Sequence, residues 1–285
     1  MKKRVLVAGA TGYLGQYLVK ELKKRDFWVR VLIRREDQKE MFDEVDDFYL
    51  AEITKPESMQ GICSGINWVF STVGITRQKD GLRYMDVDYQ GNANLLKQAL
   101  KEEVEAFQYV SAIHGDQLRH LKIFEAKERF VDELKAASLR HSVARPNGFF
   151  SDMGDFLSMA KRGRVYLFGH GNFKLNPVHG ADLAEVCVNK MIAEESEFTV
   201  GGPDFFTHTE LAEEALKAWQ KPIKISYLPD WTRRFIIWIL RNFTSSKTYG
   251  PIEFFLTAMA ADNIADSYGT HRLKDFFKME VQRNF

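Results

Sequence analysis

Three glycines near the start of the chain have the spacing of a phosphate-binding turn. The segment Gly-Ala-Thr-Gly-Tyr-Leu-Gly follows the apolar run 5–8 directly and precedes a stretch with helical apolar spacing. A buried strand that enters a helix through glycines directs backbone N–H groups and the positive helix end at a phosphate. Gly9 permits the tight turn, Gly12 lets the backbone approach the phosphate, and Gly15 lets the helix pack on the strand. We therefore predict a dinucleotide site contacted by Gly9, Thr11, Gly12, Tyr13, Leu14 and Gly15.

Two arginines occupy the position that distinguishes NAD from NADP. An acidic side chain about 20 residues after the glycines would accept a hydrogen bond from the ribose 2′-OH of NAD. This chain has Arg34 and Arg35 there, after the predicted strand 28–33. Guanidinium groups can hold a 2′-phosphate by charge-assisted hydrogen bonds and can stack on adenine. We predict NADP (NADPH) as the cofactor; the alternative is a solvated turn with Glu36 and Asp37.

Alternating strand and helix patterns through the first half supply the scaffold for these residues. Strands are predicted near 28–33, 48–50, 68–74, 106–112 and 142–145, and helices near 12–24, 56–62, 87–99 and 124–134. Such alternation is typical of a parallel sheet in an α/β fold. Ligands bind at the carboxyl ends of such strands. We therefore expect the cofactor to be lined by Ser71, Thr72, Val73 and Gly74, with Glu52 at the rim of the adenine pocket.

The regular alternation ends where proline and glycine follow the sixth predicted strand, at Pro146-Asn147-Gly148. We expect a smaller substrate lobe to begin there. The segment after Asn176-Pro177 reads as a helix that returns to the first domain. The predicted domains are therefore 1–147 with 176–200 for the cofactor, and 148–175 with 201–285 for the substrate.

Composition favours small-molecule chemistry over binding to a charged polymer. The 285 residues include 40 basic and 39 acidic side chains, so no overall field attracts nucleic acid or anionic lipid. Cys63 and Cys187 are isolated and show no disulfide or metal-ligand spacing, which favours a reduced compartment. The apolar run after the basic N-terminus is too short for a signal peptide. We expect a cytoplasmic protein that binds no metal; its oligomeric state stays open.

With these residues in hand, the chain resembles the extended or atypical branch of the short-chain dehydrogenase/reductase superfamily, near its NmrA-like and divinyl-reductase-like members. The resemblance spans nearly the whole chain and implies a Rossmann-type doubly wound parallel sheet with a smaller C-terminal substrate lobe. It also implies that Asn92 and the segment Pro146, Asn147, Gly148 and Phe149 contact the cofactor. The motifs that carry it, besides the glycine turn, are Ser71-Thr72-Val73-Gly74, Asp88-Tyr89-Gln90-Gly91-Asn92, Tyr109-Val110-Ser111, Arg145-Pro146-Asn147-Gly148 and Asn176 to Ala184.

The same resemblance assigns the candidate catalytic residues. The superfamily pairs a tyrosine with a lysine four residues later, on one face of a helix. Here Lys127 has Ile123 at that spacing, so the usual proton-donating phenol is missing. The resemblance implies that Lys127 binds the nicotinamide ribose, with Ser111 at the end of the preceding strand. His114 lies on the loop between them, where it is a candidate for the missing acid. The alternatives are an exposed helical lysine, a serine that satisfies a turn, and a solvated loop histidine.

The segment 231–243 is unusually apolar and aromatic and carries arginines near both ends. It is too short and too charged to span a bilayer. We expect a buried or pocket-lining helix that shields the substrate, with only weak vesicle binding, since the net charge is near zero. A membrane-surface helix and a subunit contact are the alternatives.

These observations predict an NADP-dependent oxidoreductase for an apolar, conjugated small molecule. An activated double bond or enone demands less of an acid than a simple ketone, which suits a chain without the usual tyrosine. The alternative is a non-catalytic NADPH-binding sensor or accessory subunit.

Overall fold

The computed structural model describes residues 2–75 and 81–283 and divides the chain into two compact units. Unit 1 comprises Met1–Arg145 and Ala184–Phe198, and unit 2 comprises Pro146–Leu183 and Thr199–Phe285. The sequence predicts the same order of segments but places the boundaries at 147, 176 and 200. The largest difference is the segment 176–183, which lies in unit 2.

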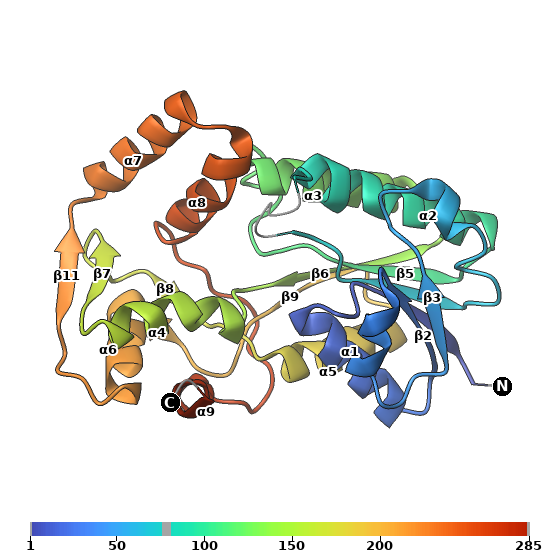
Figure 1. Cartoon of the computed structure of the whole chain (residues 1–285), viewed down its shortest axis with the longest axis horizontal. Coiled ribbons are helices and arrows are strands. Elements are labelled where there is room, and N and C mark those ends of the chain that lie inside the picture. Colours follow the sequence, from blue (N-terminus) through green and yellow to red (C-terminus); the bar gives the residue numbers. More distant parts are fainter. Residues whose placement is uncertain (1, 76–80, 284–285) are drawn as a thin grey trace. The chain divides into compact units, whose positions relative to one another are not determined.

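A seven-stranded parallel sheet forms the centre of the α/β fold, as predicted (Figure 1). Its buried strands are rich in Val, Leu, Ile and Phe because helices cover both faces of such a sheet. Adjacent strands pair in parallel register, for example Val7 with Val31 on one side and with Phe70 on the other. The strands lie in the order β3 (Asp47–Leu50), β2 (Trp28–Ile33), β1 (Arg4–Ala8), β4 (Trp68–Ser71), β5 (Ala106–Val110), β6 (Arg140–Pro146) and β9 (Glu197–Val200).

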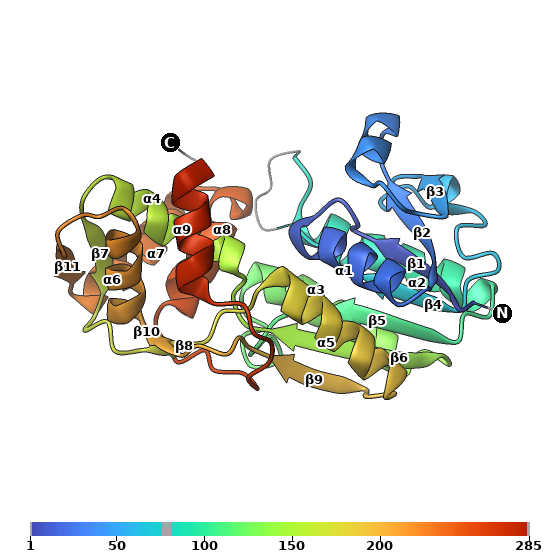
Figure 2. The same ribbon diagram turned by 90° about the horizontal axis from the view of Figure 1, so that it is seen from below.

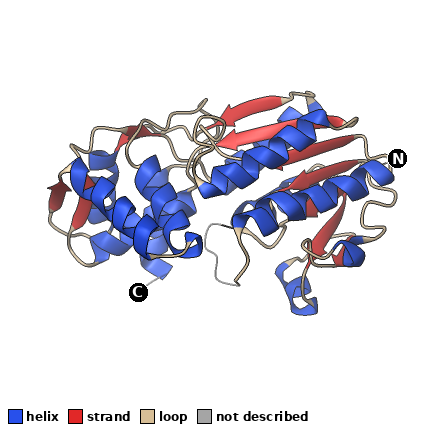
Figure 3. Ribbon diagram, turned by 90° about the horizontal axis from the view of Figure 1, so that it is seen from above, coloured by secondary structure: helices blue, strands red, loops and turns tan. Residues whose placement is uncertain are grey.

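Helices cover the two faces of this sheet. Figure 1 shows α2 (Asn92–Lys101) and α3 (Lys122–Ala136) on one face, and α1 (Tyr13–Lys24) and α5 (Gly180–Ile192) on the other. Figures 2 and 3 view the sheet from these two sides. The arrangement is the doubly wound one that the sequence predicts, with the carboxyl ends of β1, β4 and β5 on one edge.

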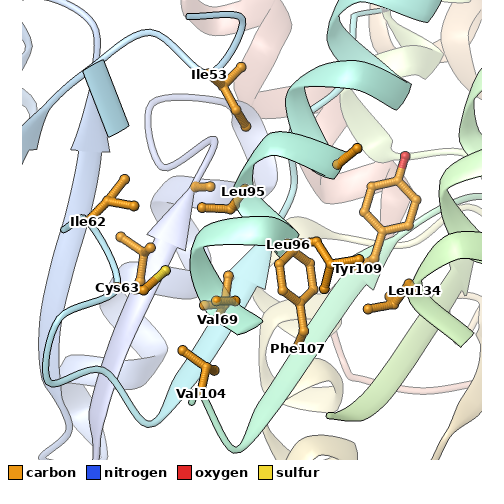
Figure 4. Packing of buried hydrophobic residues seen from close by; sticks show 14 of the residues in the cluster. Ile53, Ile62, Cys63, Val69, Leu95, Leu96, Val104, Phe107, Tyr109 and Leu134 are labelled. Carbon is orange, nitrogen blue, oxygen red and sulfur yellow. The ribbon is translucent and has the colours of Figure 1, made fainter. Parts of the chain in front are cut away.

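The core between the sheet and the α2–α3 layer extends to the candidate site. Leu95 and Leu96 pack in one cluster with Phe107 and Tyr109 of β5, all fully or almost fully buried (Figure 4). Phe130 of α3 belongs to the same cluster. The Tyr109 ring meets the Phe130 ring edge to face, with centroids 4.7 Å apart. Tyr109 is therefore a core residue, and its hydroxyl is the one polar atom of its side chain.

A π-helical segment, Met85–Gly91, precedes α2 where the sequence predicts one continuous helix. Such single-turn widenings inside helices recur at functional sites. Here the buried Asn92 side chain donates to the backbone oxygens of Val87 and Asp88, at 3.4 and 2.9 Å. These bonds fix the segment that carries Asp88.

Unit 2 is built from short strands and helices around its own core. Strand β7 (Val165–Phe168) pairs in parallel with β11 (Ile225–Leu228), and β8 (Lys174–Leu175) pairs with β10 (Phe206–Thr207) in antiparallel fashion. Phe150, Phe156, Leu211, Leu273 and Phe277 are central to the core. The helices are α4 (Gly154–Lys161), α6 (His208–Ala218), α7 (Asp230–Phe243), α8 (Ser246–Ala258) and α9 (Leu273–Arg283).

Helix α7 differs from the expectation of a buried helix. None of its side chains is buried, and Trp231, Trp238 and Phe243 are 65%, 56% and 76% exposed. Apolar composition alone cannot distinguish a core helix from a surface helix with an apolar outer face. Over the described part of the chain, no helix is long and apolar enough to cross a membrane.

Candidate functional site

The glycine turn has the geometry that phosphate binding requires. Gly9 has a φ of +80°, and a Cβ there would lie 2.5 Å from the Thr72 hydroxyl. The Gly12 N–H donates to the Gly9 oxygen at 3.0 Å, which closes the turn. A Cβ on Gly15 would lie 2.1 Å from the Gly9 oxygen, so only glycine lets α1 pack this closely.

The first turn of α1 is free of competing side chains. Its N-cap, Gly12, provides no side-chain hydrogen bond, and the turn contains no acidic residue. The backbone N–H groups of a first helical turn and the positive end of the helix dipole favour an anion at such a terminus. Thr11, Tyr13 and Leu14, predicted to contact the dinucleotide, lie in this same turn.

The arginine pair follows β2 as predicted, in an exposed segment. Gln38 accepts hydrogen bonds from the backbone N–H groups of Arg34 and Arg35, at 2.8 and 3.1 Å. The Arg35 guanidinium pairs with Asp37 at 3.0 Å, which is part of the solvated turn considered above. Glu52, at the end of β3, accepts from Thr54 at 2.9 Å and pairs with Lys55 at 2.7 Å.

Ser71 and Asn92, both predicted to contact the cofactor, are fully buried and bonded to each other. The Ser71 hydroxyl donates to Asn92 Oδ1 at 2.5 Å, and Asn92 also donates to the Val73 oxygen at 3.3 Å. Thr72 donates to the Gly9 oxygen at 3.1 Å. These bonds join the end of β4 to the glycine turn and to α2, so the backbone of Val73 and Gly74 is held in place.

Lys127 on α3 is the centre of a polar cluster at the ends of β4 and β5. Its Nζ lies 3.0 Å from Asp88 Oδ1 and donates to the Tyr109 hydroxyl at 3.3 Å. The Asp88 side chain is fully buried and also accepts from the Ile75 N–H at 3.1 Å. A Cβ on Gly74 would lie 2.7 Å from Asp88 Oδ1 and 2.8 Å from Lys127 Nζ, so the exposed Gly74 backbone borders the cluster directly.

Burial raises the pKa of Asp88, and the Lys127 ammonium partly offsets this rise. Burial alone would lower the pKa of Lys127, but electrostatic interactions and hydrogen bonds with Tyr109 and Asp88 raise it above its ordinary value. Burial raises the pKa of Tyr109, so the phenol is neutral. Lys127 is therefore a protonated ammonium, and its 12% exposed side chain leaves it within reach of a ligand.

Ser111 belongs to a neighbouring cluster instead. Its hydroxyl donates to Glu128 Oε1 at 2.6 Å, and Glu128 binds both terminal nitrogens of Arg145 at 2.8 Å. Arg145 also pairs with Glu197 at 2.5 Å. This buried network ties β5, α3, β6 and β9 together. It gives the Ser111 hydroxyl a structural partner.

His114, Ile123 and the segment 146–149 complete the set of predicted residues. His114 follows β5 in a half-buried position with a φ of +58°. Ile123 is buried on α3, consistent with a side chain that has no chemical role. Pro146, Asn147, Gly148 and Phe149 belong to unit 2, where Asn147 donates to Asn176 Oδ1 at 2.9 Å and to the Asn263 oxygen.

Asp88 and Tyr109 are the site residues that sequence reasoning missed. Tyr109 lies 18 positions before Lys127 on another element, so the four-residue spacing of a helical pair could not indicate it. Asp88 stands inside a motif that we used for the resemblance alone. The sequence did offer one signal for Asp88: it is a charged residue within a helix whose apolar spacing indicates a buried face.

The residues present fit a dinucleotide. A positive-φ glycine, a helix N-terminus with no side-chain cap and the close packing at Gly15 form a turn that larger residues at positions 9 and 15 would disrupt. Glycine at position 74 lets a ligand approach the backbone beside the Lys127 ammonium. A pyrophosphate would therefore bind at the α1 terminus and a ribose beside Lys127.

Comparisons with known proteins identify the family and the fold of this chain. A family model described as NAD(P)H-binding matches residues 9–194. The chain is 25% identical to the chloroplastic divinyl chlorophyllide a 8-vinyl-reductase of Arabidopsis thaliana over 98% of this chain and 76% of that protein. It is 21% identical to the photosystem II assembly factor Ycf39 of Trieres chinensis, over 79% and 72%. The fold matches a solved structure of AtPrR2 with NADP⁺ and (+)pinoresinol, with a TM-score of 0.76 at 17% identity over 98% and 99%.

Proposed function

We propose, because this chain belongs to the NAD(P)H-binding family of atypical short-chain dehydrogenases/reductases, that it is a reductase that uses NADPH. Its substrate is an apolar, conjugated small molecule with an activated C=C or C=O bond. Preference for NADPH follows from Arg34 and Arg35, whose charges suit a 2′-phosphate at the exposed end of β2.

The observation that carries this proposal is the Asp88–Lys127–Tyr109 cluster. A lysine with a 3.0 Å ion pair and a 3.3 Å hydrogen bond is held in one position. Holding a charged group in place before the reaction lets it stabilise developing charge without reorganisation. The alternative was an exposed helical lysine, which would need neither Asp88 nor Tyr109 as a partner.

NADPH supplies the hydride when bound. Lys127 has three N–H donors, of which one faces Asp88 and one bonds Tyr109. The third would bind a ribose hydroxyl of the cofactor. Its positive charge also favours negative charge that develops on the reduced substrate. Tyr109 acts as a positioning residue, because its ring is fixed in the core and its hydroxyl holds the ammonium.

The missing phenol narrows the substrate class. Ile123 cannot donate a proton, and the Ser111 hydroxyl is bonded to Glu128. Reduction of an activated double bond places the negative charge on a delocalised system, which water can protonate. The similarity to a vinyl-reductase supports this class.

The test is a screen of enones, quinones and vinyl-bearing tetrapyrroles with NADPH, followed by the absorbance of the cofactor. We expect oxidation with at least one compound, and a loss of about 10²-fold or more in turnover for Lys127→Ala, typical of a group that stabilises the reaction's charge. Lys122→Ala, an exposed lysine on the same helix, is the matched control and should retain full activity.

A non-catalytic NADPH-binding accessory protein is the second candidate. It is favoured by Ile123 in place of the phenol and by the similarity to a protein named as an assembly factor. NADPH oxidation no faster than that of Lys127→Ala across the panel would reject the reductase and support this role. NADPH affinity measured on the same samples would show that the cofactor still binds.

A further inference from the structure

Helix α7 exposes its aromatic residues on one continuous stripe. Trp231, Phe235 and Trp238 follow one another at spacings of four and three residues, which places them on one helix face. They are 65%, 50% and 56% exposed, and Phe243 at the end of the helix is 76% exposed. Soluble proteins rarely expose contiguous apolar patches of this kind without a partner.

The rings of the aromatic stripe are arranged in contact with one another. The Phe235 and Trp238 rings stack with centroids 6.0 Å apart and an interplanar angle of 13°. Trp231 meets Phe235, and Trp238 meets Phe243, each at 6.5 Å. The stripe is therefore one surface rather than four scattered side chains.

Two arginines of α7 bind the neighbouring helix α8, which Figure 1 shows beside it. Arg241 pairs with Glu253 of α8, whose side chain is 4% exposed, and the 11% exposed Arg233 donates to the Leu256 oxygen of α8 at 3.5 Å. Polar groups therefore hold α7 on α8 while its aromatic residues stay exposed, the reverse of an ordinary surface helix.

Positive charge borders the aromatic stripe. Within 230–249 the basic residues are Arg233, Arg234, Arg241 and Lys247, and the only acidic residue is Asp230. The Arg234 side chain is 76% exposed and makes a surface ion pair with Asp230 at 2.8 Å, and that of Arg241 is 49% exposed beside Glu253. Aromatic rings with arginines beside them are typical of helices that lie in the interface of an anionic membrane.

We propose that α7 docks this protein on an anionic phospholipid surface. Trp231, Phe235 and Trp238 enter the boundary between headgroups and acyl chains, and the 76% exposed Arg234 contacts the headgroup phosphates. A second copy of the chain fits this surface less well, because a symmetric contact across the stripe would bring the same arginines together. The near-zero net charge of the whole chain does not oppose docking, since the attraction acts over about one Debye length.

Cosedimentation with vesicles tests the proposal without cofactor or substrate. The vesicles are phosphatidylcholine alone or with about 30% phosphatidylglycerol, to supply the anionic surface. Wild-type protein should pellet with the anionic vesicles. The double variant Phe235→Ser, Trp238→Ser should lower the partition coefficient about tenfold or more, since both rings lose their apolar burial. Phe205→Ser, Ile223→Ser, which alters two equally exposed apolar residues elsewhere in unit 2, should not.

The electrostatic part is tested by Arg234→Gln, with the exposed Arg162→Gln as its control. Arg234→Gln alone should weaken binding to anionic vesicles and leave the weaker binding to phosphatidylcholine unchanged. Equal pelleting of the wild type and the stripe variant would overturn the proposal, as would absence of wild-type binding. Light scattering that shows a dimer lost in the stripe variant, without vesicle binding, would assign the surface to a second copy. Circular dichroism checks that each variant is folded.

Discussion

At the scale of single residues, the polar atoms around Lys127 come from three separate elements. Asp88 lies on the π-helical segment, Tyr109 on β5 and Lys127 on α3. Local spacing in a sequence reports only which residues share a face of one element. The glycine turn was predictable because its residues are consecutive, whereas the cluster at Lys127 depends on how β5 and α3 pack.

Nucleotide preference is a prediction that belongs to two residues. The Arg34→Ala, Arg35→Ala variant should lose about tenfold or more of its NADPH affinity relative to NADH, because charge-assisted hydrogen bonds to the 2′-phosphate are lost. Fluorescence titration with both nucleotides measures the ratio. Lys20→Ala, Lys24→Ala removes two exposed charges from α1 and serves as the control. An unchanged ratio in the arginine variant would mean that the Arg35–Asp37 pair is only a solvated turn.

At the scale of elements, the positions of the strands and of most helices were predictable from the sequence. The exposure of helix α7 was not. The predicted strand 28–33 matches β2 in both bounds, because a short apolar run ended by charges leaves little freedom. The same reasoning treated α7 as buried or pocket-lining, although the structure leaves its aromatic residues exposed. An apolar sequence indicates that a helix face binds another apolar surface, but it does not tell whether that surface belongs to the same chain or to a partner.

Helix α6 provides a prediction about stability. Its N-cap Thr207 accepts from the Glu210 N–H at 3.1 Å, and Glu210 accepts from the Thr207 N–H at 2.7 Å. This capping box satisfies two backbone donors. Thr207→Ala should lower the free energy of unfolding by about 1 kcal/mol.

Urea denaturation measures this change, and Thr207→Ser, which retains the hydroxyl, is the control. If Thr207→Ala and Thr207→Ser were equally stable, the capping hydrogen bond would contribute nothing measurable in this protein.

At the scale of the whole molecule, a cofactor cradle, a held lysine and an exposed aromatic helix occur in one chain. The cradle and the lysine lie in unit 1, and α7 lies in unit 2. We propose reduction at the first and membrane docking at the second. Apolar conjugated substrates partition into lipid, so docking would raise their concentration around the protein.

Transfer of deuterium from NADPH labelled at C4 of the nicotinamide tests the central claim most directly. The protein is incubated with the labelled cofactor and the screen of conjugated compounds, and the products are analysed by mass spectrometry. We expect a product that carries one deuterium from the cofactor, formed far more slowly by Lys127→Ala and at the normal rate by Lys122→Ala. Saturable NADPH binding with no deuterium in any product would contradict the reductase and leave a protein that only binds the dinucleotide.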